Sequence, residues 1–348
     1  MGLTHAGFNL IAFLNAHHAL PILFVIVPSF FALSGFLVAG SLERNTIPTF
    51  LTLRAIRIVP ALAVEVFLSA LLIGPIVTSL PLSAYFTDPE FFSYFLNIVG
   101  DIHFTLPGAF ENNPLPGMVN GQLWTIPFEL KCYSLITLAG IAGLVRFPRL
   151  FFAVSIVAAL AMCGRVITAH TIPADLGALP LPPGTLSVLA FLFGAALYFN
   201  RSAIPFSAPV GIISAGLSWV LMTRAETLYL ASLPIAYTTV YVGLLSPPKI
   251  WLIKGADYSY GIYLYGFPLQ QIVTHFLPDH LRFAVLNFAV AVPLAWLCAW
   301  ASWHLVEKQA LDRKQAMTRL ADLFAARLTG KTAHTAATPQ RVTAPRER

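Results

Sequence analysis

The stretch Pro28-Ser-Phe-Phe-Ala-Leu-Ser-Gly-Phe-Leu-Val-Ala-Gly-Ser-Leu-Glu-Arg44, followed after a short polar link by Arg54-Ala-Ile-Arg-Ile-Val-Pro60, decides the fold class. A long apolar run ends in an acidic and a basic residue, and two arginines then stand directly before the next apolar run. This order is typical of two membrane-crossing helices joined by a short connection on the side of the membrane where basic residues gather.

Arg54 and Arg57 are spaced i, i+3, so a helix carries both guanidinium groups on one face. Two permanently charged, fork-shaped donors suit a phosphate or carboxylate ligand better than an apolar core. The alternative is that they are snorkelling anchors that orient the protein in the membrane. These residues alone leave both interpretations open with similar weight.

The composition also indicates a membrane protein. Apolar residues make up 57% of the 348 residues, charged residues only 10%, and the mean hydropathy is +0.75. A soluble domain normally carries about a quarter charged residues, so we expect an all-α polytopic membrane protein. The net charge of +6 comes largely from the C-terminal tail and does not indicate a nucleic-acid partner. The three cysteines lie inside apolar segments without the spacing of metal ligands or a disulfide.

Apolar runs long enough to cross about 30 Å of hydrocarbon predict about nine spans, the second of which contains Glu65. Their approximate bounds are 19–41, 59–80, 122–145, 149–168, 184–199, 206–222, 227–245, 256–276 and 283–304. Alternate connections carry the basic residues, which predicts that these connections and the C-terminus are cytoplasmic. They are Arg44, Arg54 and Arg57; Arg146 and Arg149; Arg201; Lys249 and Lys254; and Lys308, Arg313 and Lys314.

Three segments lie outside this pattern. Residues 81–120, between the second and third spans, are too polar to span and too aromatic for a linker, so we expect an outward-facing, partly helical lid. Residues 1–18 have no basic region followed by a clean apolar stretch, so they are not a signal peptide and look like a truncated N-terminal segment, the outer end of a missing helix. Residues 311–348 are expected to form a basic, disordered cytoplasmic tail in reach of anionic lipid.

Charged residues inside membrane segments are costly and usually functional. Glu129 could act as a base or orient an imidazole, and pairing with Lys131 is disfavoured because i, i+2 places the two on nearly opposite helix faces. For Glu65 we favour a structural role as counter-ion for Arg54 or Arg57. No histidine is singled out by spacing, and the sequence contains no phosphate-binding Gly-rich loop, no metal-binding pattern and no nucleophile elbow.

Several motifs occur in an order that resembles the acyltransferase-3 family of integral-membrane O-acyltransferases, over roughly residues 19–310. They are Phe30-Phe-Ala-Leu-Ser-Gly-Phe-Leu37, Arg54-x-x-Arg57-Ile-x-Pro60, Leu123-Trp-Thr-Ile-Pro-Phe-Glu129 with Tyr133, Asp257-Tyr-Ser-Tyr-Gly-Ile-Tyr-Leu264 with Pro268, and Leu305-Val-Glu-Lys308. The resemblance implies ten transmembrane helices in the family, of which the first is largely missing here. It also implies transfer of an acyl group, usually acetyl from acetyl-CoA, to a hydroxyl of a cell-surface carbohydrate.

The resemblance also implies roles for particular residues. His5 would be the catalytic histidine with Glu129 as its support, and Arg54 and Arg57, with Ser34 beside them, would bind the acyl donor. Acceptor binding or structural support would fall to Trp124, Asn120, Tyr133 and Tyr260. The partners would be acyl-CoA as co-substrate, a carbohydrate or lipid-linked carbohydrate acceptor and membrane lipid, with no permanently bound cofactor, no metal and no nucleic acid. The location would be the bacterial inner membrane.

The chain departs from the family pattern at three places. No arginine precedes His5 by eleven residues, Gly266 stands where many members have histidine, and Gln309 replaces a frequent proline. Two other functions therefore stay open: a transporter or flippase of lipid-linked sugars, which the absence of inverted repeats disfavours, and an inactive, truncated acyltransferase. Release of free CoA that depends on acyl-CoA separates the enzyme from both.

Overall fold

The computed structural model of the protein describes residues 21–169, 183–245 and 256–329. These residues form helices joined by turns and loops, and extended pairing among them is limited to two isolated bridges, Thr78 with Ala109 and Thr105 with Met118. The all-α class predicted from the composition is confirmed.

The first two long helices are α3 (Ile26–Arg44), preceded by the short α2 (Pro21–Phe24), and α4 (Ile47–Leu68), which continues through a π-helical turn, η1 (Ser69–Ile73), into α5 (Gly74–Val77). The second span therefore begins at Ile47, well before the predicted residue 59. Thr46 caps this helix by accepting a hydrogen bond from the Thr49 amide, and Pro48 occupies its first turn. Both are helix-start signals that the two arginines obscured in the sequence.

Each of the other predicted spans coincides with helices in the described residues. They are η3 (Gly121–Thr125) with α8 (Ile126–Ile141), α9 (Pro148–Ala169), α10 (Gly184–Phe199), α11 (Ala208–Met222), η5 (Ala225–Ala231) with α12 (Ser232–Leu244), α13 (Ser259–Phe276) and α14 (Ala284–Ser302). Within the part of the chain that the structure describes, 5 helical stretches are long and apolar enough to cross a membrane, and α10 and α11 are shorter apolar helices. These findings agree with a polytopic membrane protein, and the number of spans stays a prediction.

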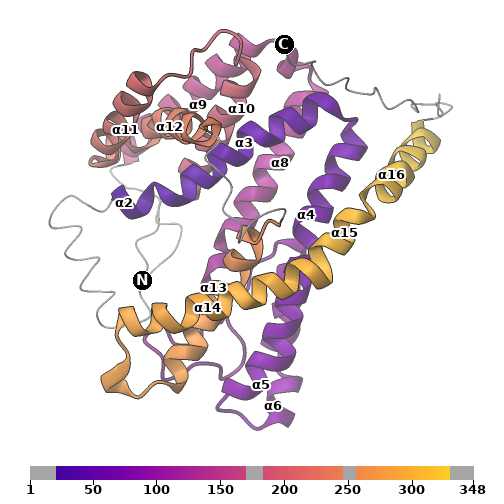
Figure 1. Cartoon of the computed structure of the whole chain (residues 1–348), viewed down its shortest axis with the longest axis vertical. Helices are drawn as coiled ribbons and strands as arrows, with labels where there is room; N and C mark the ends of the chain where they lie inside the picture. The colour runs from indigo at the N-terminus through magenta and orange to yellow at the C-terminus, as the bar shows by residue number, and fades with distance from the viewer. Residues whose placement is uncertain (1–20, 170–182, 246–255, 330–348) are drawn as a thin grey trace, which may run out of the picture.

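The helices form two groups that meet at α3 and α10. In Figure 1, α9, α11 and α12 gather on one side of α3, and α4, α8 and α13 lie on the other. Side chains of α3 and α10 contribute to the buried apolar core of both groups. The α3–α10 contact therefore joins the two halves of the molecule.

Two glycines allow this contact. A Cβ on Gly35 of α3 would overlap the carbonyl oxygen of Phe191 in α10, and a Cβ on Gly194 of α10 would overlap the carbonyl oxygen of Ala32 in α3. Small residues let helix backbones approach closely in a membrane, where packing rather than the hydrophobic effect drives association.

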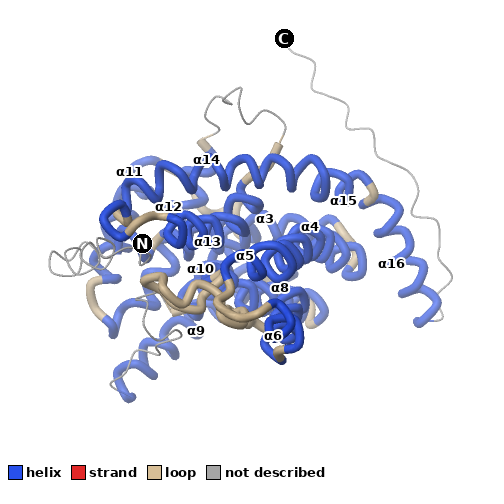
Figure 2. Tube along the Cα trace, turned by 90° about the horizontal axis from the view of Figure 1, so that it is seen from below, coloured by secondary structure: helices blue, strands red, loops and turns tan. Residues whose placement is uncertain are grey.

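The segment predicted as a lid is partly helical, as expected, with α6 (Leu82–Thr87), α7 (Pro89–Ser93) and η2 (Tyr94–Val99) followed by a long loop. Figure 2 shows this loop across the lower ends of the helices. Tyr85 donates a hydrogen bond to the Ala70 carbonyl (2.7 Å), and Asn113 Nδ2 donates to Gln271 Oε1 of α13 (2.8 Å). Buried contacts thus fasten the segment to two of the helices that it covers.

The C-terminal helices follow one another in a long diagonal rod (Figure 1). After α14 come a second π-helical turn, η8 (Trp303–Glu307), then α15 (Lys308–Asp312) and α16 (Lys314–Thr329). The expectation of a disordered tail from residue 311 is therefore wrong over residues 314–329. Asp322 of α16 accepts hydrogen bonds from Thr46 and Thr49 (2.6 and 2.8 Å), which dock this helix at the start of α4.

We expect Gly35→Ala to destabilise the protein by about 1–3 kcal/mol, because the added methyl group collides with a backbone atom that cannot move alone. Gly216→Ala in α11 is the matched control, since a Cβ there meets nothing within 4 Å. Thermal unfolding in detergent should show a clear loss for the first variant and none for the second. Equal melting temperatures would contradict the close α3–α10 contact.

Candidate active site

Arg57 of α4 lies in a charged cluster built from three helices. Its Nη2 lies 2.6 Å from Oδ2 of Asp257, which stands just before α13, and its Nη1 lies 3.9 Å from Oε2 of Glu307 in η8. The guanidinium also lies 5.7 Å from the ring centroid of Tyr260, a geometry that favours a cation–π interaction. Arg57 therefore ties α4 to the start of α13 and to the end of α14.

The two acidic partners differ in exposure. Glu307 is only 4% exposed, and Ser302 donates a hydrogen bond to its Oε1 (3.1 Å). Asp257 is half exposed; partial burial raises its pKa, but hydrogen bonds from Ser259 and the Arg57 guanidinium outweigh this effect and hold the pKa of the carboxyl below its usual range. Arg57 thus has two carboxylate neighbours.

Arg54, three residues earlier on α4, makes different contacts from Arg57. Among the described residues it has no ion pair, its Nε is buried without a hydrogen-bond partner, and its guanidinium lies 5.8 Å from the ring centroid of Phe50. At 1.5 Å per residue, Arg54 and Arg57 lie roughly 10 and 15 Å along α4 from Ile47. They are therefore inside the helix, and the predicted position at its entrance is corrected by the earlier start of α4.

Glu129, in the first turn of α8, lies within electrostatic range of these arginines and forms no ion pair with them among the described residues. Its Oε1 accepts a 2.5 Å hydrogen bond from the Tyr133 hydroxyl, which also interacts with Ser34 of α3. The charges of Arg57 and Arg54 act on the Glu129 carboxylate. Lys131 lies instead over the Phe128 ring, 4.6 Å from its centroid, in line with the expectation that it does not pair with Glu129.

The structure thus brings six residues singled out in the sequence to one place inside the bundle. They come from four helices: Ser34, Arg54, Arg57, Glu129, Tyr133 and Tyr260. We call these six residues the arginine–glutamate cluster. Arg54, which has no ion pair among the described residues, is suited to bind an anionic group, and the Glu129 carboxylate near it is suited to orient a proton-transfer residue.

Glu65 does not pair with the arginines, so its predicted role as their counter-ion is wrong. It is 1% exposed, and its Oε1 accepts hydrogen bonds from Ser69 (2.8 Å) and from Asn120 (2.9 Å). Asn120 also donates to the Leu264 carbonyl (3.0 Å). Glu65 lies two helical turns beyond Arg57 on α4, and the acids that face Arg57 are Asp257 and Glu307 instead.

Tyr263 of α13 lies between these two polar groups. Its hydroxyl contacts the Thr125 hydroxyl and donates to the Gln122 carbonyl, and the charges of Glu129 and Glu65 both act on it. Trp124 is buried and packs against the Phe128 ring. Asn120 and Trp124 therefore lie outside the arginine–glutamate cluster, with contacts that suit structural support.

Sequence reasoning assigned no role to Asp257, Glu307 or Tyr263, although all three lie in motifs that it quoted. A search for acidic partners of the two arginines would have found the first two, because a charge inside a membrane segment needs a counter-charge. His5 lies outside the described residues. Among those described, no histidine is joined to Glu129 by a hydrogen bond or an ion pair.

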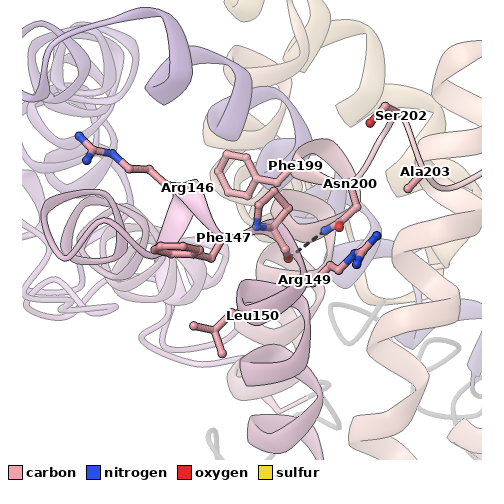
Figure 3. A pocket seen from close by; sticks show the side chains of 9 residues that line it. Arg146, Phe147, Arg149, Leu150, Phe199, Asn200, Ser202 and Ala203 are labelled. Atoms are coloured by element: carbon pink, nitrogen blue, oxygen red, sulfur yellow. Dashed lines mark hydrogen bonds between the residues drawn. The ribbon is translucent and has the colours of Figure 1, made fainter.

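A separate hollow lies where the α8–α9 connection meets the end of α10. It encloses about 500 Å³ and is lined by Arg146, Phe147, Pro148, Arg149, Leu150, Phe199, Asn200, Ser202 and Ala203. Figure 3 shows the guanidinium groups of Arg146 and Arg149 pointing to opposite sides, and Asn200 donates to the Pro148 carbonyl (3.0 Å). No predicted site residue lines it, and its two cations do not converge on one ligand position.

Apolar helices around a partly buried polar cluster are the architecture of a polytopic membrane protein. A family model described as an acyltransferase domain matches residues 3–304. The chain belongs to this family, the acyltransferase-3 family, and is a membrane O-acyltransferase. It is 28% identical over 296 residues to an O-acetyl transferase of Shigella phage Sf6, an alignment that covers 83% of this chain and 85% of the relative. No solved structure matches the chain.

We expect Arg57→Ala to destabilise the protein by about 1–3 kcal/mol, because it leaves the buried Glu307 without its counter-charge. Arg54→Ala, in the same helix, should change stability by less than about 0.5 kcal/mol, because no ion pair is lost. Thermal unfolding in detergent measures both, and Arg57→Ala combined with Glu307→Gln should recover part of the loss. Equal shifts for the two single variants would contradict the assigned pairing.

Proposed function

We propose that this O-acyltransferase takes its acyl group, acetyl in the simplest case, from acyl-CoA and transfers it to a hydroxyl of a cell-surface carbohydrate. One observation carries the proposal: Arg54, without an ion pair among the described residues, stands inside the bundle beside the Glu129–Tyr133 pair. The printed name of the Sf6 phage relative, an O-acetyl transferase, supports acetyl as the group that is moved.

Arg54 and Arg57 would have different roles in donor binding. Coenzyme A carries phosphate groups, and guanidinium groups bind phosphate through paired N–H donors. Arg57 already faces Asp257 and Glu307, so it would mainly hold the helices in place and set the local charge. Arg54 keeps its donors available and would contact a phosphate directly. Basic connections at the same end favour entry of the donor from the cytoplasm and location in the inner membrane.

The transfer itself needs a base near the thioester. The imidazole assigned to His5 would remove the proton of the acceptor hydroxyl while the hydroxyl oxygen attacks the thioester carbonyl carbon. A carbon–oxygen bond forms, the carbon–sulfur bond breaks, and the imidazolium returns the proton to the departing CoA thiolate. Glu129 would hold the imidazole in the useful tautomer, and its hydrogen bond from Tyr133 would fix the carboxylate for this purpose.

The acceptor would approach under the 81–120 segment. In Figure 1, α6 of this segment lies at the bottom of the bundle, and the connection between α3 and α4 lies at its top. Donor and acceptor would then reach the arginine–glutamate cluster from opposite ends, so that the acyl group crosses the membrane during transfer.

We expect membranes that contain the protein to release free CoA from acetyl-CoA, and Arg54→Ala to raise the KM for acetyl-CoA about tenfold or more, since a charge-assisted hydrogen bond is lost. Arg54→Lys should restore this only in part, because an ammonium group lacks the fork. The matched control is Arg149→Ala, which removes a cation at the same end but outside the cluster. If Arg54→Ala and Arg149→Ala behave alike, Arg54 does not bind the donor.

We expect Glu129→Gln to lower kcat at least about a hundredfold with little change in the KM for acetyl-CoA, because it removes support for the base but no donor contact. Tyr133→Phe should lower kcat less, since the carboxylate stays in place. Steady-state rates of CoA release measure both. A Glu129→Gln variant with full kcat would remove Glu129 from the mechanism.

A further inference from the structure

Helix α16 has two faces of different character. The face with partly buried side chains carries only small or polar residues, namely Thr318, Ala321, Asp322, Ala325 and Ala326. The opposite face carries four large apolar side chains that are exposed: Met317 (44%), Leu320 (66%), Leu323 (50%) and Phe324 (65%). A helix that packs on a protein core normally shows the reverse arrangement, with its apolar stripe inward.

The orientation is fixed by two hydrogen bonds. The two carboxylate oxygens of Asp322 accept from the hydroxyls of Thr46 and Thr49, in the first turn of α4, where an acidic group also interacts favourably with the helix dipole. This contact turns the polar face toward the protein. The apolar face therefore points away from α4, and within the described residues it stays uncovered.

Basic residues accompany the apolar face. Arg313 lies one turn before Met317, Arg327 lies one turn after Phe324, and Lys314 and Arg319 complete the set. None of the four has a salt bridge within the described part of the chain. A helix with large apolar side chains flanked by cations is suited to the surface of a lipid bilayer, where acyl chains lie beneath anionic headgroups.

We propose that the outward face of α16 lies on the anionic phospholipid surface of the membrane leaflet at the end of the bundle that carries Arg44, Arg146 and Arg201. The apolar side chains enter the boundary between headgroups and acyl chains, and Arg313 and Arg327 contact lipid phosphates. This interaction is independent of the acyl-transfer reaction and does not rest on the proposed donor or acceptor.

Two features favour lipid over a second copy of the chain. The hydrogen bonds of Asp322 with Thr46 and Thr49 hold the helix beside the connection between two apolar helices rather than out in the aqueous phase. A symmetric contact between two α16 faces would also bring Arg313 and Arg327 of one copy against the same cations of the other, and like charges repel. An anionic partner removes this repulsion.

The test uses the full chain in nanodiscs of phosphatidylcholine, with or without phosphatidylglycerol, and a charged maleimide that does not enter lipid. L320C places a cysteine on the apolar face, and Q315C places one at an exposed position on the polar side. All variants carry Cys298→Ser, because this cysteine is partly exposed while Cys132 and Cys163 are buried, and the chain with this change alone gives the background. We expect phosphatidylglycerol to slow labelling of L320C strongly and to leave Q315C unchanged.

Charge-neutralised variants show whether the cations are responsible. Arg313→Gln and Arg327→Gln should each weaken the effect of phosphatidylglycerol on L320C about fivefold, as expected for one basic residue at an anionic surface. Labelling of L320C as fast as Q315C in both lipid mixtures would overturn the proposal. So would protection of L320C in detergent together with elution of the protein as a dimer, because a second copy would then cover the face.

Discussion

Arg57 is a partly buried charge among apolar helices, and its need for counter-charges governs much of the structure. Asp257 and Glu307 supply them from positions far along the chain. Because an unpaired charge among apolar helices is costly, the ion pairs of Arg57 hold α4 against the start of α13 and the end of α14. The neighbouring Arg54 has no acidic partner among the described residues. Because Arg57 is paired and Arg54 is not, Arg54 is the residue of this motif that is suited to an anionic ligand.

The positions of most helices could be predicted closely from the sequence, because each is a local run of apolar residues. The predicted range 184–199 coincides with α10, and most other predicted bounds lie within a few residues of the helix ends. The start of α4 was missed because arginines interrupt the apolar pattern, and the acid that pairs with Arg57 lies 200 residues away in the chain. The helical part of the tail, α16, was missed because a search for long apolar runs overlooks four apolar residues on one face of a charged helix, and because its docking depends on Thr46 and Thr49.

The sequence predicted which residues belong to the candidate site, but it did not predict which of them pair with one another. Residue type and position marked Arg54, Arg57 and Glu129 as charges in apolar surroundings, and the motif order added Ser34, Tyr133 and Tyr260. Which acid faces which base is set by helix packing, which a single sequence does not encode locally. Glu65 illustrates the limit: it has the right charge and lies in the same helix as Arg57, yet it faces Ser69 and Asn120.

The two π-helical turns, η1 and η8, each begin or end at a polar group of the interior. Ser69, which bonds Glu65, opens the first, and Glu307, which faces Arg57, closes the second. A π-helical turn holds one residue more than an α-helical turn, so it absorbs an extra residue that would otherwise rotate the rest of the helix by about 100°. Deleting one residue within η1 or η8 would restore a regular α-helix and leave the segments on either side facing nearly as they do now. These two turns are therefore the places where the evolution of this bundle can add or remove a residue with the least effect on how the helices pack.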